Sequence, residues 1–293
     1  MGEADVSTWQ VSRPDPSRSM TRTVPTITEA PSVASGPVVR RVRLAWPDDF
    51  DPIWTARPEL AISANAVSLL MPHVEPYVVD AVADVVDDLD VPLAADAQAF
   101  VRQERQHHSQ HRRFNDLVVD RFPGLSRIEA VMAATFRFLR RRASSRFALA
   151  FAAGFETVAF SAARWTAGRQ HDLFDDADET ATTLFLWHLA EEVEHKGVAH
   201  DVYETTGGGR SRYVVAMICS MLLLAAFTVA GAVSMLWSTR RLFHPVAHLR
   251  MLVWSVSFLF ELLPNMTISA LPGHHPDHFV DPVFHDLDLL DVA

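Results

Sequence analysis

Cysteine, glycine and tyrosine are scarce in this chain of 293 residues. The single cysteine, Cys219, excludes an intramolecular disulfide framework and fits a reducing, cytoplasmic compartment. Only 11 glycines, three tyrosines and few runs of β-branched residues argue against a large β-sheet. An excess of basic residues is also missing, because the formal net charge is -10, so nucleic acid is not an expected partner.

Apolar residues and histidines are abundant instead. Hydrophobic residues make up 49% of the chain, which is enough for a sizeable and mostly helical core. The 14 histidines are a high count, and several of them lie close together in two segments. Histidines scattered over a surface would carry little meaning, whereas clustered histidines indicate a site.

The first 37 residues are rich in Pro, Ser, Thr and Arg and show no apolar periodicity. We therefore expect a disordered leader over residues 1–37 and a single helical domain over residues 38–293, which opens with an extended segment. The leader lacks the hydrophobic centre of a secretory signal. Met1 and Met20 are both candidate start sites.

The most informative segment is 187–203, WHLAEEVEHKGVAHDVY, which no Gly or Pro interrupts before residue 197 and which therefore predicts a helix. On a helix, His188, either Glu191 or Glu192, and His195 share one face. Two imidazoles beside a carboxylate are a donor set that a transition metal binds. Glu192 and His195 also match the Glu-x-x-His element of carboxylate-bridged dimetal bundles.

A second segment, 103–115, reads QERQHHSQHRRFN and repeats this pattern. Glu104, His107 and His111 are spaced by three and four residues, so they also share one helical face. One such stripe alone is common on solvated helices. Two stripes in one chain favour a shared metal site over two coincidental polar faces.

Two further carboxylates lie in apolar surroundings. Glu75 sits in a proline-kinked apolar segment, where it is either an exposed loop residue or a ligand from a first helix. Glu156 is the only acidic residue of the apolar segment 147–166. A lone buried carboxylate is costly, so we expect a ligand role in preference to an ion pair with Arg164.

The helical patterns cover four segments before the 187–203 segment, and we expect Asp96 to cap the second of them. These segments are 61–89, 97–122, 127–142 and 147–166.

Near the C-terminus, residues 213–237 carry no charge and are long enough to cross a bilayer. Residues 246–263 contain His248, Arg250 and Glu261, which makes them a poor membrane span. We expect an apolar helical hairpin over 213–263 that packs on the bundle, and weak membrane association stays open. The histidine-rich tail, 270–293, is loop-like and either covers the site or is exposed.

The candidate ligands follow a known order, which is Glu, Glu-x-x-His, Glu, Glu-x-x-His. It is the order of the ferritin-like dimetal carboxylate bundle. His111 and His188 lie one turn beyond each motif and either complete the coordination or support it. The expected fold is therefore all-α, a ferritin-like bundle with a dimetal centre plus the C-terminal apolar hairpin. Its candidate ligands are Glu75, Glu104, His107, His111, Glu156, His188, Glu192 and His195, with Glu191 as a substitute for Glu192.

These motifs resemble the bacterial family described as predicted metal-dependent hydrolase, a ferritin-like group. The resemblance rests on MPHVE, QERQHHSQHRRFN, the apolar segment around Glu156 and WHLAEEVEHKGVAHDVY, and it covers about residues 38–280. LPGHHPDH is similar to the family's Pro-Gly-aromatic-His-Pro segment, with His274 in place of the aromatic residue. The family includes a nonheme diiron monooxygenase that hydroxylates a diterpenoid in antibiotic biosynthesis of the platensimycin and platencin type, and the chain is similar to that type.

The resemblance implies two Fe ions, O2 as co-substrate, a small lipophilic substrate and an electron donor such as a ferredoxin or a reductase. The first hypothesis is therefore hydroxylation of an unactivated C–H bond in a terpenoid-like substrate. The second is hydrolysis by metal-activated water, with Mn or Zn as alternative metals and Glu191 or Glu194 as the base. Metal storage is a third, and a homodimer is compatible with all three.

Overall fold

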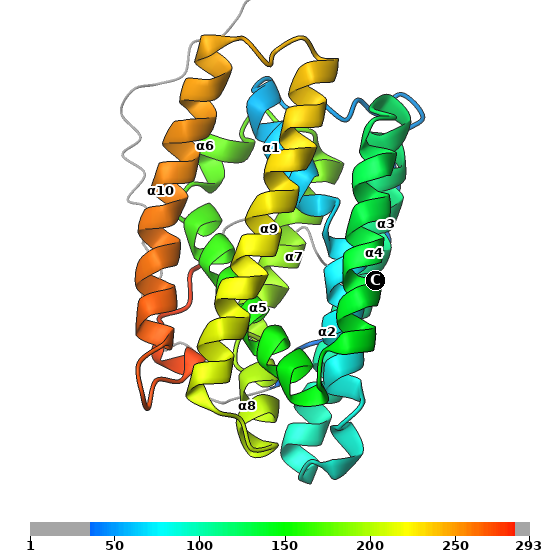
Figure 1. Cartoon of the computed structure of the whole chain (residues 1–293). Helices are drawn as coiled ribbons and strands as arrows, with labels where there is room; N and C mark the ends of the chain where they lie inside the picture. Colours follow the sequence, from blue (N-terminus) through cyan, green and yellow to red (C-terminus); the bar gives the residue numbers. More distant parts are fainter. Residues whose placement is uncertain (1–35, 285–293) are drawn as a thin grey trace, which may run out of the picture. The chain divides into compact units, whose positions relative to one another are not determined.

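The computed structural model describes residues 36–284, and over that range the chain is helical, without a named β-strand (Figure 1). One isolated bridge joins Thr55 to Ala177. The all-α prediction is therefore confirmed. The leader expected over 1–37 lies outside this range except for its last two residues, and the tail from His285 onward also lies outside it, so both stay predictions.

Helices of very different length follow one another along the chain. In chain order they are α1 (Pro58–Ser68), α2 (Met71–Ala83), η1 (Val86–Asp88), α3 (Val91–Arg121), α4 (Leu125–Arg142), α5 (Ser145–Ala167), α6 (Gln170–Phe174), α7 (Glu179–Glu194), α8 (Val198–Thr205), α9 (Arg210–Ser238), α10 (Pro245–Ser269) and η2 (Pro276–His278).

Polar side chains fix where several of these helices begin. The side chain of Asp90 accepts a hydrogen bond from the backbone N–H of Leu93 and so caps α3. The prediction that Asp96 caps this helix is wrong, because Asp90, with a proline in the first helical turn, provides an earlier start. Ser144 and Asp178 cap α5 and α7 in the same way.

The segment 187–203 is not one continuous helix. Helix α7 ends at Glu194, and His195 follows with φ -111° and ψ 9° before α8 begins after Gly197. The segment around Asp277 packs closely here, because a Cβ on Gly197 would lie 3.2 Å from Oδ1 of that residue. The break still leaves His195 fully buried, so it turns its ring into the bundle.

Helices α2, α3, α5 and α7 surround the interior, and α9 packs on α1 and α5 (Figure 1). Small residues allow the close approach of α9: a Cβ on Gly154 of α5 would lie 2.6 Å from Cα of Met217. Helix α10 packs on α5 and α1. The apolar segments expected to form a hairpin are thus two long helices, each with one side against the bundle.

Candidate metal centre

Seven of the eight first-choice ligands come together inside the bundle, on α2, α3 and α5, along α7 and directly after its end. They form two groups, and within each group one ligand atom per residue lies within 4.8 Å of the others. All seven side chains are buried. The groups are Glu75, His107 and His188, and Glu104, Glu156, Glu192 and His195.

The two groups are in direct contact. Nδ1 of His107 lies 3.2 Å from Oε1 of Glu104, and Nε2 of His188 lies 2.8 Å from Oε1 of Glu192. The rings of His107 and His188 stack with their centroids 4.1 Å apart. Glu104 and Glu192 therefore stand between the groups, where a carboxylate can bridge two neighbouring metal ions.

Buried polar atoms without a hydrogen-bond partner are concentrated in this cluster. They include both carboxylate oxygens of Glu75 and of Glu156, one oxygen each of Glu104 and Glu192, and Nε2 of His195. Oε2 of Glu156 does lie 3.2 Å from Nε2 of His195, but as an ion-pair contact. Leaving such atoms unpaired is costly. Since carboxylate oxygen and imidazole nitrogen suit iron, manganese and zinc, the residues fit a bound pair of metal ions.

The protonation equilibria show how strongly these charges interact. Burial, together with the nearby charges of Glu104 and Glu192, raises the pKa of Glu75 well above its ordinary value, and burial beside Glu192 does the same for Glu156. Burial alone would lower the pKa of His107, but its hydrogen bonds with Glu104 and Glu191 raise it to about 10. The four carboxylates therefore cannot all be ionised side by side without a cation, and a divalent metal ion would allow it.

His195 is held in one tautomer by Gln103. Nε2 of Gln103 donates to the carbonyl oxygen of Val38 and to Glu194, so its Oε1 faces Nδ1 of His195 at 2.9 Å. Because Oε1 can only accept, Nδ1 of His195 carries the proton. Nε2 therefore faces the carboxylates, on the side where a metal would take the place of its proton.

A similar chain of hydrogen bonds orients His188. Nδ2 of Asn115 donates to the carbonyl oxygen of Ser68, and Oδ1 of Asn115 accepts from the Ser68 hydroxyl at 2.6 Å. The Ser68 oxygen then accepts from Nδ1 of His111 at 2.7 Å, which leaves Nε2 of His111 to accept from Nδ1 of His188 at 2.6 Å. Nε2 of His188 is thereby turned toward Glu192, where a metal would bind, whereas both nitrogens of His111 are taken up by Ser68 and His188. The structure thus places His111 behind His188 and not in either ligand group.

Glu191 and Glu192 have different surroundings. Glu192 is in the second ligand group, whereas Oε2 of Glu191 lies 3.0 Å from Nε2 of His107 and its Oε1 accepts from Arg40 at 3.3 Å. Arg40 also binds Glu194 at 2.6 Å. The structure therefore favours Glu192 over its substitute. Neither Arg40 nor Gln103 can be recognised as part of the site from the sequence, because no local pattern shows which helix its side chain contacts.

The histidine-rich tail meets the bundle near α8. Nε2 of His275 lies 2.6 Å from Oδ1 of Asp201, and with His200 these residues form a third group of potential ligand atoms. Lys196, next to His195, pairs with Asp281. Within residues 270–284, the tail thus packs against the junction of α7 and α8 and contributes no residue to either of the two central groups.

Comparison with known proteins gives one result at the level of the family. A family model described as predicted metal-dependent hydrolase matches residues 38–279. Neither the curated proteins nor the solved structures contain a match. The matched residues include all of the candidate ligands.

Proposed function

The chain belongs to the predicted metal-dependent hydrolase family, and from this premise we propose that it is a nonheme diiron monooxygenase that hydroxylates a lipophilic, terpenoid-like substrate. The observation that carries the proposal is the set of unpaired, buried carboxylate and imidazole atoms in two touching groups. Their order along the chain matches that of the dimetal carboxylate bundles.

Glu75, His107 and His188 would hold one iron, and Glu156 and His195 the other, with Glu104 and Glu192 between them. When bound, two irons supply the reductive activation of dioxygen and the insertion of one oxygen atom into a C–H bond. Gln103 keeps the proton of His195 on Nδ1, and His111 accepts the proton of His188, so both histidines present their Nε2 lone pairs to the metals.

Buried aromatic side chains pack against the histidines of this centre. Phe100 meets the ring of His195 edge-on at 4.8 Å, and Trp187 meets the ring of His107 at 5.0 Å. Both aromatic residues are fully buried. A dry environment protects a reactive oxidant and suits an apolar substrate, which supports the oxygenase over a reaction that needs water.

The proposed reaction requires external electrons. The substrate R–H, O2, two electrons and two protons give R–OH and water, so one oxygen atom enters the product and the other leaves as water. Cys219 is the only cysteine, so the chain offers no redox-active cysteine pair. We therefore expect a separate ferredoxin or reductase as the donor.

Hydrolysis by metal-activated water is the second candidate, because it is what the family's description states. It needs a carboxylate free to act as a base. Glu191 and Glu194, the two carboxylates proposed for this role, are both bound by Arg40. Because both are paired with a guanidinium, neither is free to act as a base, and this supports the oxygenase over the hydrolase.

Isotope labelling separates the two reactions. The reduced, iron-loaded protein is supplied with candidate lipophilic substrates, either under labelled oxygen gas or in labelled water, and the product mass is measured. The oxygenase predicts one labelled atom from the gas and no turnover under argon. Label only from water, with turnover under argon that zinc supports, would establish the hydrolase instead.

A further inference from the structure

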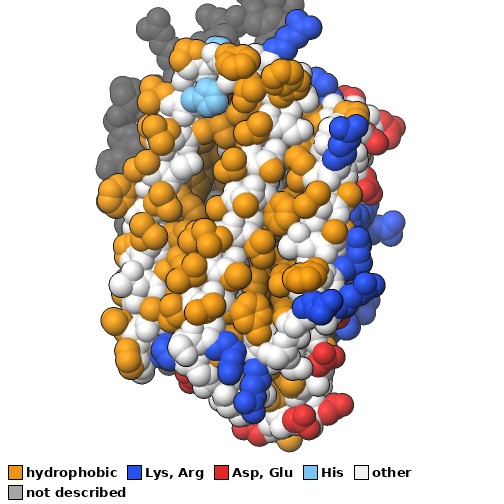
Figure 2. All heavy atoms as spheres, viewed as in Figure 1, with side chains coloured by type: hydrophobic (Ala, Val, Ile, Leu, Met, Phe, Trp, Pro, Cys, Tyr) orange, Lys and Arg blue, Asp and Glu red, His pale blue; other side chains and the backbone are white. Residues whose placement is uncertain are grey.

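One side of the bundle exposes an unusually large apolar surface, made by the outer sides of α9 and α10 (Figure 2). Both helices are long and apolar enough to cross a membrane, as is α5, but α5 is mostly covered by the bundle whereas most of α9 and α10 is not. Monomeric soluble proteins rarely expose an apolar surface of this extent. Its large exposed residues include Val215, Ile218, Leu222, Val229, Val233, Trp237, Leu249, Leu252, Val253, Val256, Leu259, Phe260 and Leu263.

The charged residues of α10 pair with the bundle, and Arg250, which is half-exposed, lies close to the start of the helix. Arg250 donates to Glu59 of α1 at 3.2 Å, and Glu261 accepts from Arg164 of α5 at 3.1 Å. Residues 213–237 of α9 carry no charge. His248, Arg250 and Glu261 make this segment a poor membrane span, but their polar groups are bound: the His248 ring contacts the carbonyl oxygen of Leu242, and the other two pair with the bundle, so contact of the outer side with a membrane stays open.

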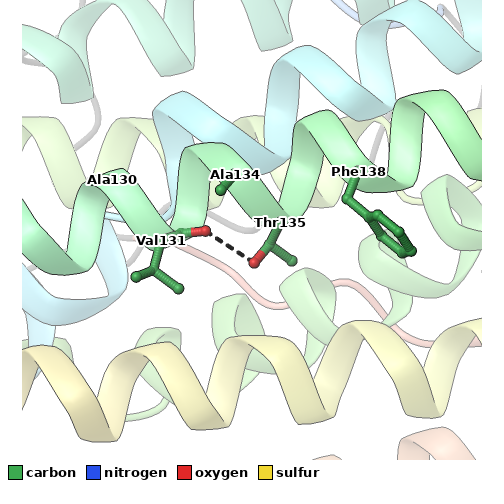
Figure 3. Close-up of a pocket in the computed structure, with 5 residues that line it drawn as sticks. All are labelled: Ala130, Val131, Ala134, Thr135 and Phe138. Atoms are coloured by element: carbon green, nitrogen blue, oxygen red, sulfur yellow. Dashed lines mark hydrogen bonds between the residues drawn. The ribbon is translucent and has the colours of Figure 1, made fainter.

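A shallow, open groove on the face of α4, which lies beside α9, extends the apolar surface (Figure 3). It has a volume of about 450 Å³ and an almost wholly apolar lining. The one side-chain hydroxyl in it, that of Thr135, donates to the carbonyl oxygen of Val131 in its own helix at 2.9 Å. The groove is lined by Ala130, Val131, Ala134, Thr135 and Phe138.

Arginines stand at the ends of the helices that make this surface, although the whole chain is acidic. Arg212 is near the start of α9, Arg240 follows its end, and Arg141 and Arg142 close α4. Their neighbours Arg140 and Arg210 are engaged within the protein, with Asp80 and with the carbonyl oxygens of residues 269 and 274. Trp237 is exposed near the end of α9, where a bilayer would place its interfacial aromatic residues. Anionic lipid headgroups complement this arginine border, whereas a second copy facing the same surface would meet arginines with arginines.

We propose that the outer side of α9 and α10, with the α4 groove, lies in the plane of an anionic lipid bilayer and inserts into its acyl region. An in-plane position follows from the other side of the bundle, where α3 exposes Arg102, Arg105, Asp116 and Asp120. Carrying the bundle across the bilayer would bring these charges into hydrocarbon. This membrane contact does not depend on which reaction the protein catalyses. It would make the bilayer the source of a lipophilic substrate.

The first test is flotation of the full-length protein with vesicles. Vesicles of phosphatidylcholine with a minority of phosphatidylglycerol should carry the protein upward, and high salt should weaken this only partly, since apolar insertion remains. Leu252→Glu with Phe260→Glu, at positions 59% and 79% exposed, should lower partitioning by an order of magnitude or more. The matched control is Val91→Glu with Val283→Glu, at 84% and 66% exposed positions away from this surface.

Two results would overturn the proposal. A wild-type protein that forms a detergent-free dimer and ignores the vesicles, with the Leu252→Glu and Phe260→Glu pair splitting the dimer, would assign the surface to a second copy. Equal flotation of the surface and control pairs would show that α9 and α10 do not make the contact.

A labelling experiment separates in-plane insertion from a membrane-spanning hairpin. His244→Cys, in a Cys219→Ser background, places one thiol in the connection between α9 and α10. On sealed vesicles, an impermeant maleimide added outside should label it, because an in-plane hairpin keeps this connection on the outer surface. Protection of Cys until the vesicles are dissolved would show a spanning hairpin and overturn the in-plane proposal.

Discussion

Two buried sites in this bundle hold carboxylates in opposite ways. Glu59 of α1 is fully buried and accepts from Arg241 at 2.8 Å and from Arg250 at 3.2 Å. In the metal centre, four glutamates are equally buried, yet no Lys or Arg of residues 36–284 forms an ion pair with any of them. Their only charged partners there are histidines.

The difference shows which buried carboxylates serve structure and which await a ligand. Arginines neutralise the charge of Glu59 permanently, so this residue ties α1 to the α9–α10 connection and to α10. The central glutamates keep most of their oxygens unpaired, which is a cost that a bound cation would remove. Each prediction below tests this contrast, beginning with the largest expected effect.

Replacing Glu156 or His195 by Ala should have the largest effect. The wild-type protein is expected to bind about two metal ions per chain, as dimetal bundles do. Each substitution removes a ligand that no neighbour can replace, so most of the metal should be lost, as measured by elemental analysis after anaerobic loading. Glu59→Gln is the control and should keep full occupancy. Full occupancy in both ligand variants would refute the site.

The second prediction concerns the neighbours Glu191 and Glu192. Glu192→Ala should empty at least one metal position, because Glu192 stands between the two ligand groups. Glu191→Ala should leave most of the metal bound, since Glu191 contacts His107 from the side of Arg40. Metal analysis of the two variants side by side shows which of the two adjacent glutamates faces the metal centre. The reverse pattern would show that Glu191 is the ligand.

The site could be predicted to the extent that it depends on local spacing. Glu104 with His107, and Glu192 with His195, are recognisable because three residues span one helical turn. Glu75 and Glu156 were identified by their apolar neighbours, and the structure buries both. The sequence could not separate Glu191 from Glu192, because adjacent positions on a helix differ by a rotation that only the packing of α7 on α3 fixes.

The supporting residues could not be predicted, because their partners are distant in the chain. Gln103 meets His195, and Arg40 reaches Glu194 from the extended entry segment. The outer surface of α9 and α10 escaped prediction for a related reason. Hydropathy reveals that a segment is apolar, but only the fold shows whether other helices cover it.

Arg241→Ala tests the structural carboxylate and should cost about 2 kcal/mol of unfolding free energy. The substitution leaves Glu59 buried with Arg250 as its remaining arginine partner. The expected loss of stability is smaller than for a fully broken buried ion pair, because Arg241 is partly exposed. Urea denaturation monitored by circular dichroism measures it. Arg137→Ala on α4 is the control, because Arg137 is exposed there. Equal stability of both variants would contradict the structural role of the Glu59 pair.

Gln103→Leu should weaken metal binding by about tenfold without emptying the site. The substitution removes the acceptor of the His195 Nδ1 proton, so the imidazole loses its preferred tautomer and orientation. Competition with a chelator of known affinity gives the change. Gln106→Leu, one helical turn away and bound to the backbone of residues 40 and 42, is the matched control. If metal binding weakens to a similar extent in both variants, the effect comes from losing contacts to the extended entry segment and not from the His195 hydrogen bond.

The smallest expected effect is the acid dependence of the Glu59 pair. Burial alone would raise the pKa of Glu59, but hydrogen bonds and its two arginines hold the pKa below the ordinary value of 4.5. A carboxylate with a lowered pKa stabilises the folded state above its ordinary pKa, and this contribution disappears as the pH falls through the lowered value. The stability difference between wild type and Glu59→Gln should therefore be constant above about pH 5 and shrink below it. Denaturation of both proteins across that range measures it, with Asp48→Asn as a surface control. Because both proteins keep the same metal centre, acid loss of metal affects them equally, and a difference independent of pH would contradict the ionised pair.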